Sequence, residues 1–164
     1  CGAVKVDHTK PVEIWDRFQK WDHALGAWET TGESDYLFWM DVKDWDELHN
    51  WAMEIRQWPG VNFTSSHLIF GGTKNGTWWW QADQGVWLWG RTHQANQWKD
   101  PVKKGWAVSS FTMPGDWDAL FWVQGQTWDE VWDKARKLRH SGWETSTQVP
   151  MKSWWNKKKL EHWN

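Results

Sequence analysis

Apolar positions along the chain follow a strand-like period in some segments and a helix-like period in others. Residues 36–42 and 119–124 are apolar on both faces of an extended chain, which predicts strands that are covered on both sides. Residues 12–25 place their apolar side chains on one face of a helix instead. The first 70 residues therefore predict the order strand, helix, strand, strand, helix, strand, at 3–8, 12–25, 27–31, 36–42, 45–58 and 61–70.

The helix predicted over 45–58 begins at a sequence that can cap it. Asp44 offers a side-chain acceptor before the helix, and Glu47 lies at the third helical position, as in a capping box. Thr127 and Glu130 stand in the same relation at the start of a later helix. Both helices carry an apolar stripe that begins with Trp and that we expect to be buried. The stripes are Trp45, Leu48, Ala52 and Ile55, and Trp128, Val131, Ala135 and Leu138.

The segment before the first cap occurs a second time in the chain. Residues 32–39 and 115–122 share Gly, Asp, Phe and Trp in the same order, at a constant separation of 83 positions. Such self-similarity indicates an internal duplication. The sequence therefore predicts an α+β fold with two ferredoxin-like βαββαβ repeats. We expect the repeats to form a pseudo-dimeric α/β barrel within one chain, or two packed sheets.

The second repeat is predicted to differ from the first at its beginning. The separation of 83 positions places Trp87 and Trp89 where the first repeat has Val4 and Val6. A proline interrupts the first helix of this repeat, so we expect a short or broken helix over 94–104. The later strands are predicted at 106–113, 119–124 and 143–151. We divide the chain into a first repeat over 1–70, a Trp-containing connector over 71–85, a second repeat over 86–151 and a basic, Trp-rich tail over 152–164.

Tryptophan is the unusual feature of the composition. The chain has 22 Trp against one Tyr and 6 Phe, and each buried Trp hides about 150–250 Å². These rings exceed what one core needs, so we expect several to line a pocket, an interface or the surface. We assign assembly into a homo-oligomer or larger assembly to the Trp residues of the connector and the tail, namely Trp78, Trp79, Trp80, Trp154, Trp155 and Trp163.

The net charge and the single cysteine limit the kinds of partner and the cellular location that we expect. The net charge of −2 argues against nucleic acid, and no apolar run reaches the ~20 residues of a membrane span. Cys1 cannot form an internal disulfide. We interpret it as a processed and lipidated terminus, as a fragment boundary, or as an N-terminal nucleophile for which no partner residues are identified. A mature terminus at Cys1 would make the protein secreted or part of the cell envelope; otherwise we expect it in the cytoplasm.

Three short motifs point to a known family. They are Gly32-Glu33-Ser34-Asp35 before a central strand, Val42-Lys43-Asp44 before a helix, and Pro59-Gly60-Val61 before the last strand, and the second half keeps Gly115-Asp116-Trp117-Asp118 and Ser141-Gly142. With these motifs, residues 4–70 resemble the effector-binding (RAM) domain of the Lrp/AsnC regulators. The family usually has a DNA-binding helix-turn-helix before this domain, which this sequence does not show. It also forms dimers, whereas this chain carries two copies.

The resemblance implies a role for the aspartates of the two turns. In the family this turn lies near the ligand-binding and assembly surface. Asp35 and Asp118 would therefore bind a ligand amine, as of a small aromatic or amino-acid-like ligand, or a neighbouring backbone. The alternative is that each aspartate only caps its own turn by accepting backbone N–H groups.

Two further pairs of residues are candidates for a ligand pocket. Trp39 with Asp41, and Trp122 with Gln124, each lie two positions apart on a strand and so share one sheet face. An aromatic ring beside a polar group is typical of a pocket that orients a small molecule. The alternative is an ordinary core between sheets.

Three hypotheses about function follow from these patterns. We prefer a non-catalytic, self-assembling module of Lrp/AsnC-like fold that is structural or binds a small molecule. The second is an enzyme with an aromatic pocket, because the same fold occurs in dimeric α/β-barrel monooxygenases and haem-binding chlorite-dismutase-like enzymes. The third is an extracellular fibre or coat subunit. The seven His show no paired metal spacing, so we assign no metal site and no catalytic residue, and haem stays open as a cofactor.

Overall fold

The computed structural model describes residues 1–9, 13–75 and 84–160 of the chain. These residues form two compact units. Unit 1 combines Cys1–Ser66 with Met151–Asn164, and unit 2 consists of His67–Pro150. Each unit is described by itself below.

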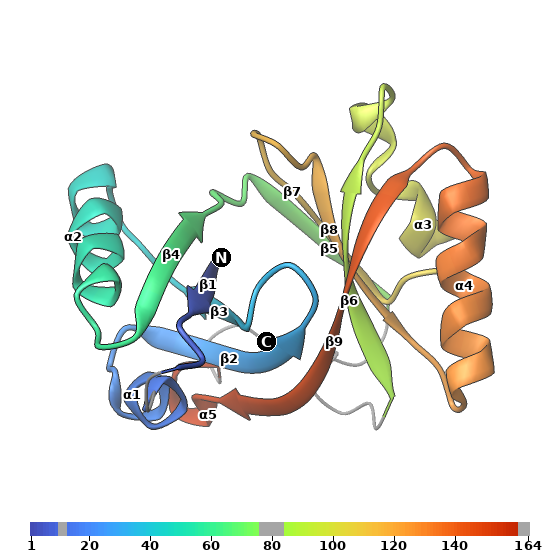
Figure 1. The fold of residues 1–164 in the computed structure, drawn as a ribbon. Coiled ribbons are helices and arrows are strands. Elements are labelled where there is room, and N and C mark those ends of the chain that lie inside the picture. Colours follow the sequence, from blue (N-terminus) through green and yellow to red (C-terminus); the bar gives the residue numbers. More distant parts are fainter. Residues whose placement is uncertain (10–12, 76–83, 161–164) are drawn as a thin grey trace. The chain divides into compact units, whose positions relative to one another are not determined.

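Unit 1 has the element order of a ferredoxin-like domain (Figure 1). Its strands lie in the order β4-β1-β3-β2, and the paired strands are antiparallel. This order is that of a split βαββαβ unit, as the sequence predicted. The elements are β1 (Gly2–Val6), α1 (Ile14–Lys20), β2 (Ala24–Thr31), β3 (Tyr36–Met40), α2 (Trp45–Arg56) and β4 (Val61–Ser66).

The core of unit 1 lies between its two helices and the sheet. Phe18 of α1 is fully buried, stacks on Phe38 of β3 with ring centroids 5.1 Å apart, and meets Trp58 edge-on at 5.1 Å. Ile14 and Ile55 complete the contact from the two helices. The periodic apolar face of each helix thus meets a strand that is buried at every position.

The first helix is shorter than the sequence predicted. The prediction extended it to residue 25, but α1 ends at Lys20 and β2 begins at Ala24. Trp21 leaves the helix with an extended backbone and directs its indole N–H at Glu54 of α2, 3.0 Å away. Long-range packing of this side chain therefore overrides the local helical period.

Unit 2 has strands in the order β9-β6-β8-β7-β5, with α3 and α4 on the same side of the sheet (Figure 1). The helix predicted over 94–104, which follows β6, is broken, as predicted, into a 3₁₀ turn and one short helix. The elements are β5 (Gly71–Lys74), β6 (Gly85–Arg91), η2 (Ala95–Gln97), α3 (Asp100–Lys103), β7 (Ser109–Thr112), β8 (Ala119–Gln124), α4 (Trp128–His140) and β9 (Glu144–Trp155). From Met151 on, β9 belongs to unit 1, and α5 (Lys157–Leu160) follows it there.

Strand register corrects one detail of the predicted repeat. Val4 lies opposite Tyr36 in unit 1, whereas Gly90 lies opposite Ala119 in unit 2. Gly90, and not Trp87, therefore occupies the position of Val4. The constant separation of 83 positions fails before the broken helix, because the chain between the first strand and the turn is shorter there.

Both predicted N-caps are confirmed, and each Glu side chain accepts from the residue before the cap and not from the cap residue itself. The Glu47 backbone N–H donates to Asp44 Oδ1 at 2.8 Å, and the Glu47 carboxylate accepts from the Lys43 N–H at 2.8 Å. Glu130 likewise donates its backbone N–H to Thr127 Oγ1 at 3.2 Å. These bonds satisfy backbone donors that the first helical turn leaves without partners.

The Trp at the start of each apolar stripe does not lie in the core, contrary to prediction. Trp45 is 68% exposed and Trp128 is 39% exposed. Each is the first residue of its helix. Trp128 instead stacks on Trp132, one turn later, with ring centroids 5.9 Å apart.

Replacing Thr127 by Ala removes the side-chain acceptor at the start of α4. We expect the free energy of unfolding to fall by about 1 kcal/mol, the usual cost of losing such a cap. Urea unfolding measures this loss. Gln126→Ala is the control, because it changes an adjacent side chain and keeps the backbone N–H that bonds to Glu130. Equal stability of Thr127→Ala and the unaltered protein would contradict the assigned cap.

Candidate functional site

The turn between β2 and β3 is built around Gly32 and Asp35. Gly32 has φ of 122°, a backbone conformation that residues with a Cβ rarely adopt. The Asp35 N–H donates to the Val4 carbonyl at 2.9 Å, and its Oδ2 accepts from the Val6 N–H at 2.9 Å. One carboxylate oxygen therefore ties the turn to the end of β1.

The turn of unit 2 has the same bonds. Gly115 has φ of 128°. The Asp118 N–H donates to the Gly90 carbonyl at 2.9 Å, and Asp118 Oδ2 accepts from the Thr92 N–H at 2.8 Å. Both aspartates thus perform the turn-capping role that was one of the two interpretations of the sequence. In each, the second carboxylate oxygen is not used by this backbone bond.

The second oxygen of Asp35 faces a pocket within unit 1. Asp35 Oδ1 lies 2.9 Å from His8 Nε2, and the His8 side chain is 76% exposed. The pocket has a volume of about 250 Å³. It is lined by Val6, His8, Glu29, Thr30, Asp35, Tyr36 and Met151.

Oxygen atoms dominate the polar lining of this pocket. Burial, and then the negative charges of Glu29 and Asp35, raise the pKa of the Tyr36 phenol above its usual value, so it stays a protonated donor at neutral pH. Glu29 also meets Lys152 Nζ at 3.4 Å. Two carboxylates within one small cavity attract a cation, and their oxygens accept hydrogen bonds from an ammonium group.

Of the predicted ligand residues, Asp35 lines this pocket. Trp39 and Asp41, the other predicted residues of unit 1, do not line it: Trp39 is buried in β3, and Asp41 follows β3 and is exposed. In unit 2, Trp122 and Gln124 do share a face, because the Trp122 indole N–H donates to Gln124 Oε1 at 2.8 Å. That pair is a hydrogen-bonded contact of β8, beside Trp87 at 5.0 Å.

Of the Trp residues assigned to assembly, Trp154 and Trp155 lie in the described part of the chain. Trp155 packs within unit 1, edge-on to Trp28 with ring centroids 4.5 Å apart, and Trp154 packs against the unit 1 core. The strand β9 thus continues past residue 151, where the prediction ended it. The other assigned residues, Trp78, Trp79, Trp80 and Trp163, lie outside the described residues. Cys1 is partly exposed.

Of the residues that line this pocket, here called the Asp35 pocket, the sequence predicted Asp35 as a ligand residue and missed the others, among them Glu29, Tyr36 and Met151. Glu29 and Tyr36 are paired across β2 and β3, so their position follows from the strand register. Met151 comes from the far end of the chain. A hairpin with Asp35 at its turn and an acidic residue on the preceding strand was the available signal for Glu29. Nothing in the sequence pointed to Met151.

The described residues also bear on metal binding and on membrane spanning. No group of three or more His, Cys, Asp or Glu in that part of the chain could hold a metal ion. None of its helices is long and apolar enough to cross a membrane.

The fold and the turn define the class of the first half of the chain as a ferredoxin-like α+β domain. Residues 3–79, which cover β1 to β5, match the family model of the Lrp/AsnC ligand binding domain. This part of the chain is therefore similar to the Lrp/AsnC ligand binding domain, as the turn motifs predicted. Comparison with curated proteins gave no significant match, and neither did comparison with solved structures.

Proposed function

We propose that this protein is a non-catalytic module that binds a small molecule through an amine group in the Asp35 pocket. The observation that carries the proposal is that the two oxygens of the Asp35 carboxylate have different partners. Asp35 Oδ2 is tied to the backbone, which fixes the side chain, while Oδ1 faces a cavity that also holds Glu29 and Tyr36. The match to the Lrp/AsnC ligand binding domain supports the same function.

The geometry suggests how an ammonium group would be held. It would approach Asp35 Oδ1 and displace the exposed His8 ring, which has water as an alternative partner. Glu29 would supply a second negative charge, and the Tyr36 hydroxyl would contact a polar group of the ligand. A small, partly enclosed site with few polar groups selects ligands by the placement of these groups.

We further infer that the chain is an internal duplication, with unit 2 derived from the same type of domain. The strand orders of the two units and the matching bonds of Asp35 and Asp118 support this inference. Asp118, Trp39, Asp41, Trp122 and Gln124 stay predicted ligand residues, and assembly into oligomers stays a prediction.

Thermal unfolding with a panel of ligands tests the amine-binding proposal. The panel contains L-amino acids and, for each, its N-acetyl derivative, which lacks the ammonium charge. We expect some free amino acids to raise the melting temperature and their N-acetyl derivatives to leave it unchanged. A ligand at 100 times its Kd stabilises the folded state by about 2.7 kcal/mol.

Charge-neutral variants locate the binding. Asp35→Asn and Glu29→Gln should each abolish or strongly reduce the ligand-induced shift. Glu33→Gln is the matched control, because it removes one carboxylate from the same turn at an exposed position that does not line the pocket. Asp118→Asn measures the loss of stability that follows when the capping carboxylate of the equivalent turn in unit 2 is removed. Equal loss of binding in Glu33→Gln, or binding that survives in both pocket variants, would contradict the proposal.

A further inference from the structure

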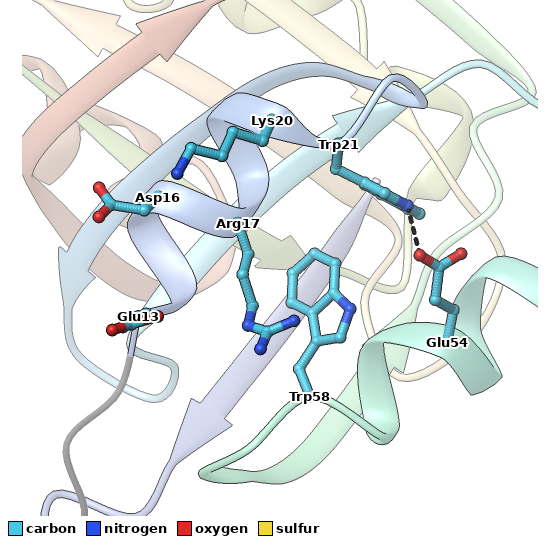
Figure 2. Close-up of a pocket in the computed structure, with 7 residues that line it drawn as sticks. All are labelled: Glu13, Asp16, Arg17, Lys20, Trp21, Glu54 and Trp58. Atoms are coloured by element: carbon cyan, nitrogen blue, oxygen red, sulfur yellow. Dashed lines mark hydrogen bonds between the residues drawn. The ribbon is translucent and has the colours of Figure 1, made fainter.

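A second pocket of unit 1 lies between α1 and the end of α2, away from the Asp35 turn (Figure 2). Its volume is about 350 Å³, within the range of small-molecule sites. None of its lining residues is shared with the Asp35 pocket. They are Glu13, Asp16, Arg17, Lys20, Trp21, Glu54 and Trp58.

Two indole rings form the apolar part of this pocket. Trp21 and Trp58 are each 8% exposed and lie edge to face, with ring centroids 5.6 Å apart. Both also contact the buried Phe18. The rings therefore belong to the core and present fixed edges to the pocket, which makes this part of the site rigid.

A fixed carboxylate lies at one end of the indole pair. Glu54 Oε1 accepts the Trp21 indole N–H at 3.0 Å (Figure 2). Among the described residues Glu54 has no ion-pair partner, so Oε2 can accept a further hydrogen bond. A carboxylate held in this way is an acceptor for an ammonium group.

A guanidinium group lies at the other end. The Arg17 guanidinium is 6.0 Å from the centre of the Trp58 ring, and Figure 2 shows it on the opposite side of that ring from Glu54. Arg17 forms no ion pair within the described part of the chain. The carboxylates of Glu13 and Asp16 point away from Trp58 in the same view. The guanidinium is thus available for a ligand carboxylate, which it can hold by two hydrogen bonds.

The arrangement selects a particular kind of zwitterion. The opposite charges are separated by indole rings, whereas an α-amino acid carries both charges on groups attached to the same carbon. We propose that this pocket binds a linear zwitterion whose carboxylate and ammonium are separated by a chain of methylene groups. Its carboxylate lies on Arg17, its ammonium on Glu54, and its methylene chain along the edges of Trp58 and Trp21.

Two sources offer this chemistry. One is a free ω-amino acid such as 5-aminopentanoate or 6-aminohexanoate. The other is a C-terminal lysine of a peptide, whose side-chain ammonium and terminal carboxylate have a similar separation. Both require the same two charged partners in the pocket, and the site is independent of the function proposed for the Asp35 pocket.

Calorimetric titration with a chain-length series tests the proposal. Glycine, 4-aminobutanoate, 5-aminopentanoate and 6-aminohexanoate are the zwitterions, and pentanoate and pentylamine are the single-charge controls. We expect saturable binding that peaks at one of the longer zwitterions, and binding about tenfold weaker for glycine and for each single-charge compound. Equal binding across the series would overturn the proposal. So would the absence of binding by the longer zwitterions at about 10 millimolar, which is the weakest affinity that the proposal allows.

Variants and a spectroscopic readout assign the site. Arg17→Gln and Glu54→Gln should each weaken binding of the best zwitterion about tenfold. Lys5→Gln and Asp46→Asn, which make the same charge changes at exposed positions outside the pocket, should leave it unchanged. With 5-fluorotryptophan incorporated, the ligand should shift the ¹⁹F resonance that Trp58→Phe removes. Retained affinity in both pocket variants, or a Trp58 resonance that the ligand does not move, would overturn the assignment.

Two further comparisons separate the sources and the two pockets. Nα-acetyl-lysine that binds tighter than 6-aminohexanoate, while its amide does not bind, identifies a C-terminal lysine as the source; the reverse order identifies a free ω-amino acid. Asp35→Asn should bind the zwitterion normally. Loss of zwitterion binding in Asp35→Asn would overturn the second site, whereas failure of the amine panel at Asp35 would leave it intact.

Discussion

Replacing Phe18 by Ala should lower the free energy of unfolding of unit 1 by about 3–5 kcal/mol, the usual cost of removing a buried aromatic ring. Phe18 is fully buried, and its ring stacks on Phe38 and meets Trp58 and Trp21 edge-on. The neighbouring rings are fixed by one another, so they cannot collapse to fill the cavity. Urea unfolding followed by circular dichroism measures the loss.

Phe63→Ala is the matched control for Phe18→Ala. Phe63 lies in β4 of the same unit but is 58% exposed, so its removal should change the unfolding free energy by less than about 1 kcal/mol. Comparable effects at both positions would contradict the assigned core. Phe18→Ala should also weaken zwitterion binding, because Trp58 and Trp21 would lose the ring against which they pack.

Replacing Gly26 by Ala should destabilise the protein by about 1–3 kcal/mol, the range for overpacking. A Cβ at this position of β2 would lie 2.5 Å from Trp155 Cε3 and 3.2 Å from the Trp154 carbonyl oxygen. The Trp155 ring is the closer obstacle, and it packs edge-on against Trp28, so it cannot move aside without losing that contact and the end of β9 would be pushed off β2. Thermal and urea unfolding measure the cost.

Two controls separate crowding from the general effect of alanine in a strand. Gly71→Ala places a Cβ no closer than 3.5 Å to its neighbours, so it should be neutral or stabilising by up to about 1 kcal/mol through the unfolded state. In a Trp155→Ala background, Gly26→Ala should lose most of its cost, because the ring it meets is absent. An unchanged cost in that background would show that Trp155 is not the obstacle.

Local signals predicted the parts of this fold that depend on neighbouring residues. The N-caps at Asp44 and Thr127 and the broken helix near residue 101 follow from hydrogen-bond donors, acceptors and proline sterics within a few positions. The end of α1 did not follow in this way. Trp21 continued the helical period, but its indole finds Glu54 of another helix, and no local pattern carries that information.

The Trp stripes show a second limit of the sequence pattern. Periodicity places Trp45 and Trp128 on the apolar face of their helices, yet both are first residues and are exposed. A period predicts the direction of a side chain but not whether a partner lies there.

The candidate sites were predictable to different degrees. Asp35 was reached through its turn and the family resemblance, and the strand register supplies Glu29 and Tyr36. The second pocket was not predicted, because Arg17 and Glu54 are ordinary surface residues of two helices in the sequence. Arg17 and Glu54 line one pocket only because Trp21 and Trp58 pack together in the folded unit.

The sharing of β9 between the units has a consequence for the order of folding during synthesis. Unit 2 is one continuous stretch, His67–Pro150, whereas unit 1 needs both Cys1–Ser66 and the residues from Met151 on. On the ribosome, the first unit to begin is thus the last to be completed. Until Trp155 emerges and covers Gly26, the β2 edge of the early chain stays open, and open strand edges promote aggregation. Nascent chains halted before Met151 should therefore be the stage at which this protein most needs a chaperone.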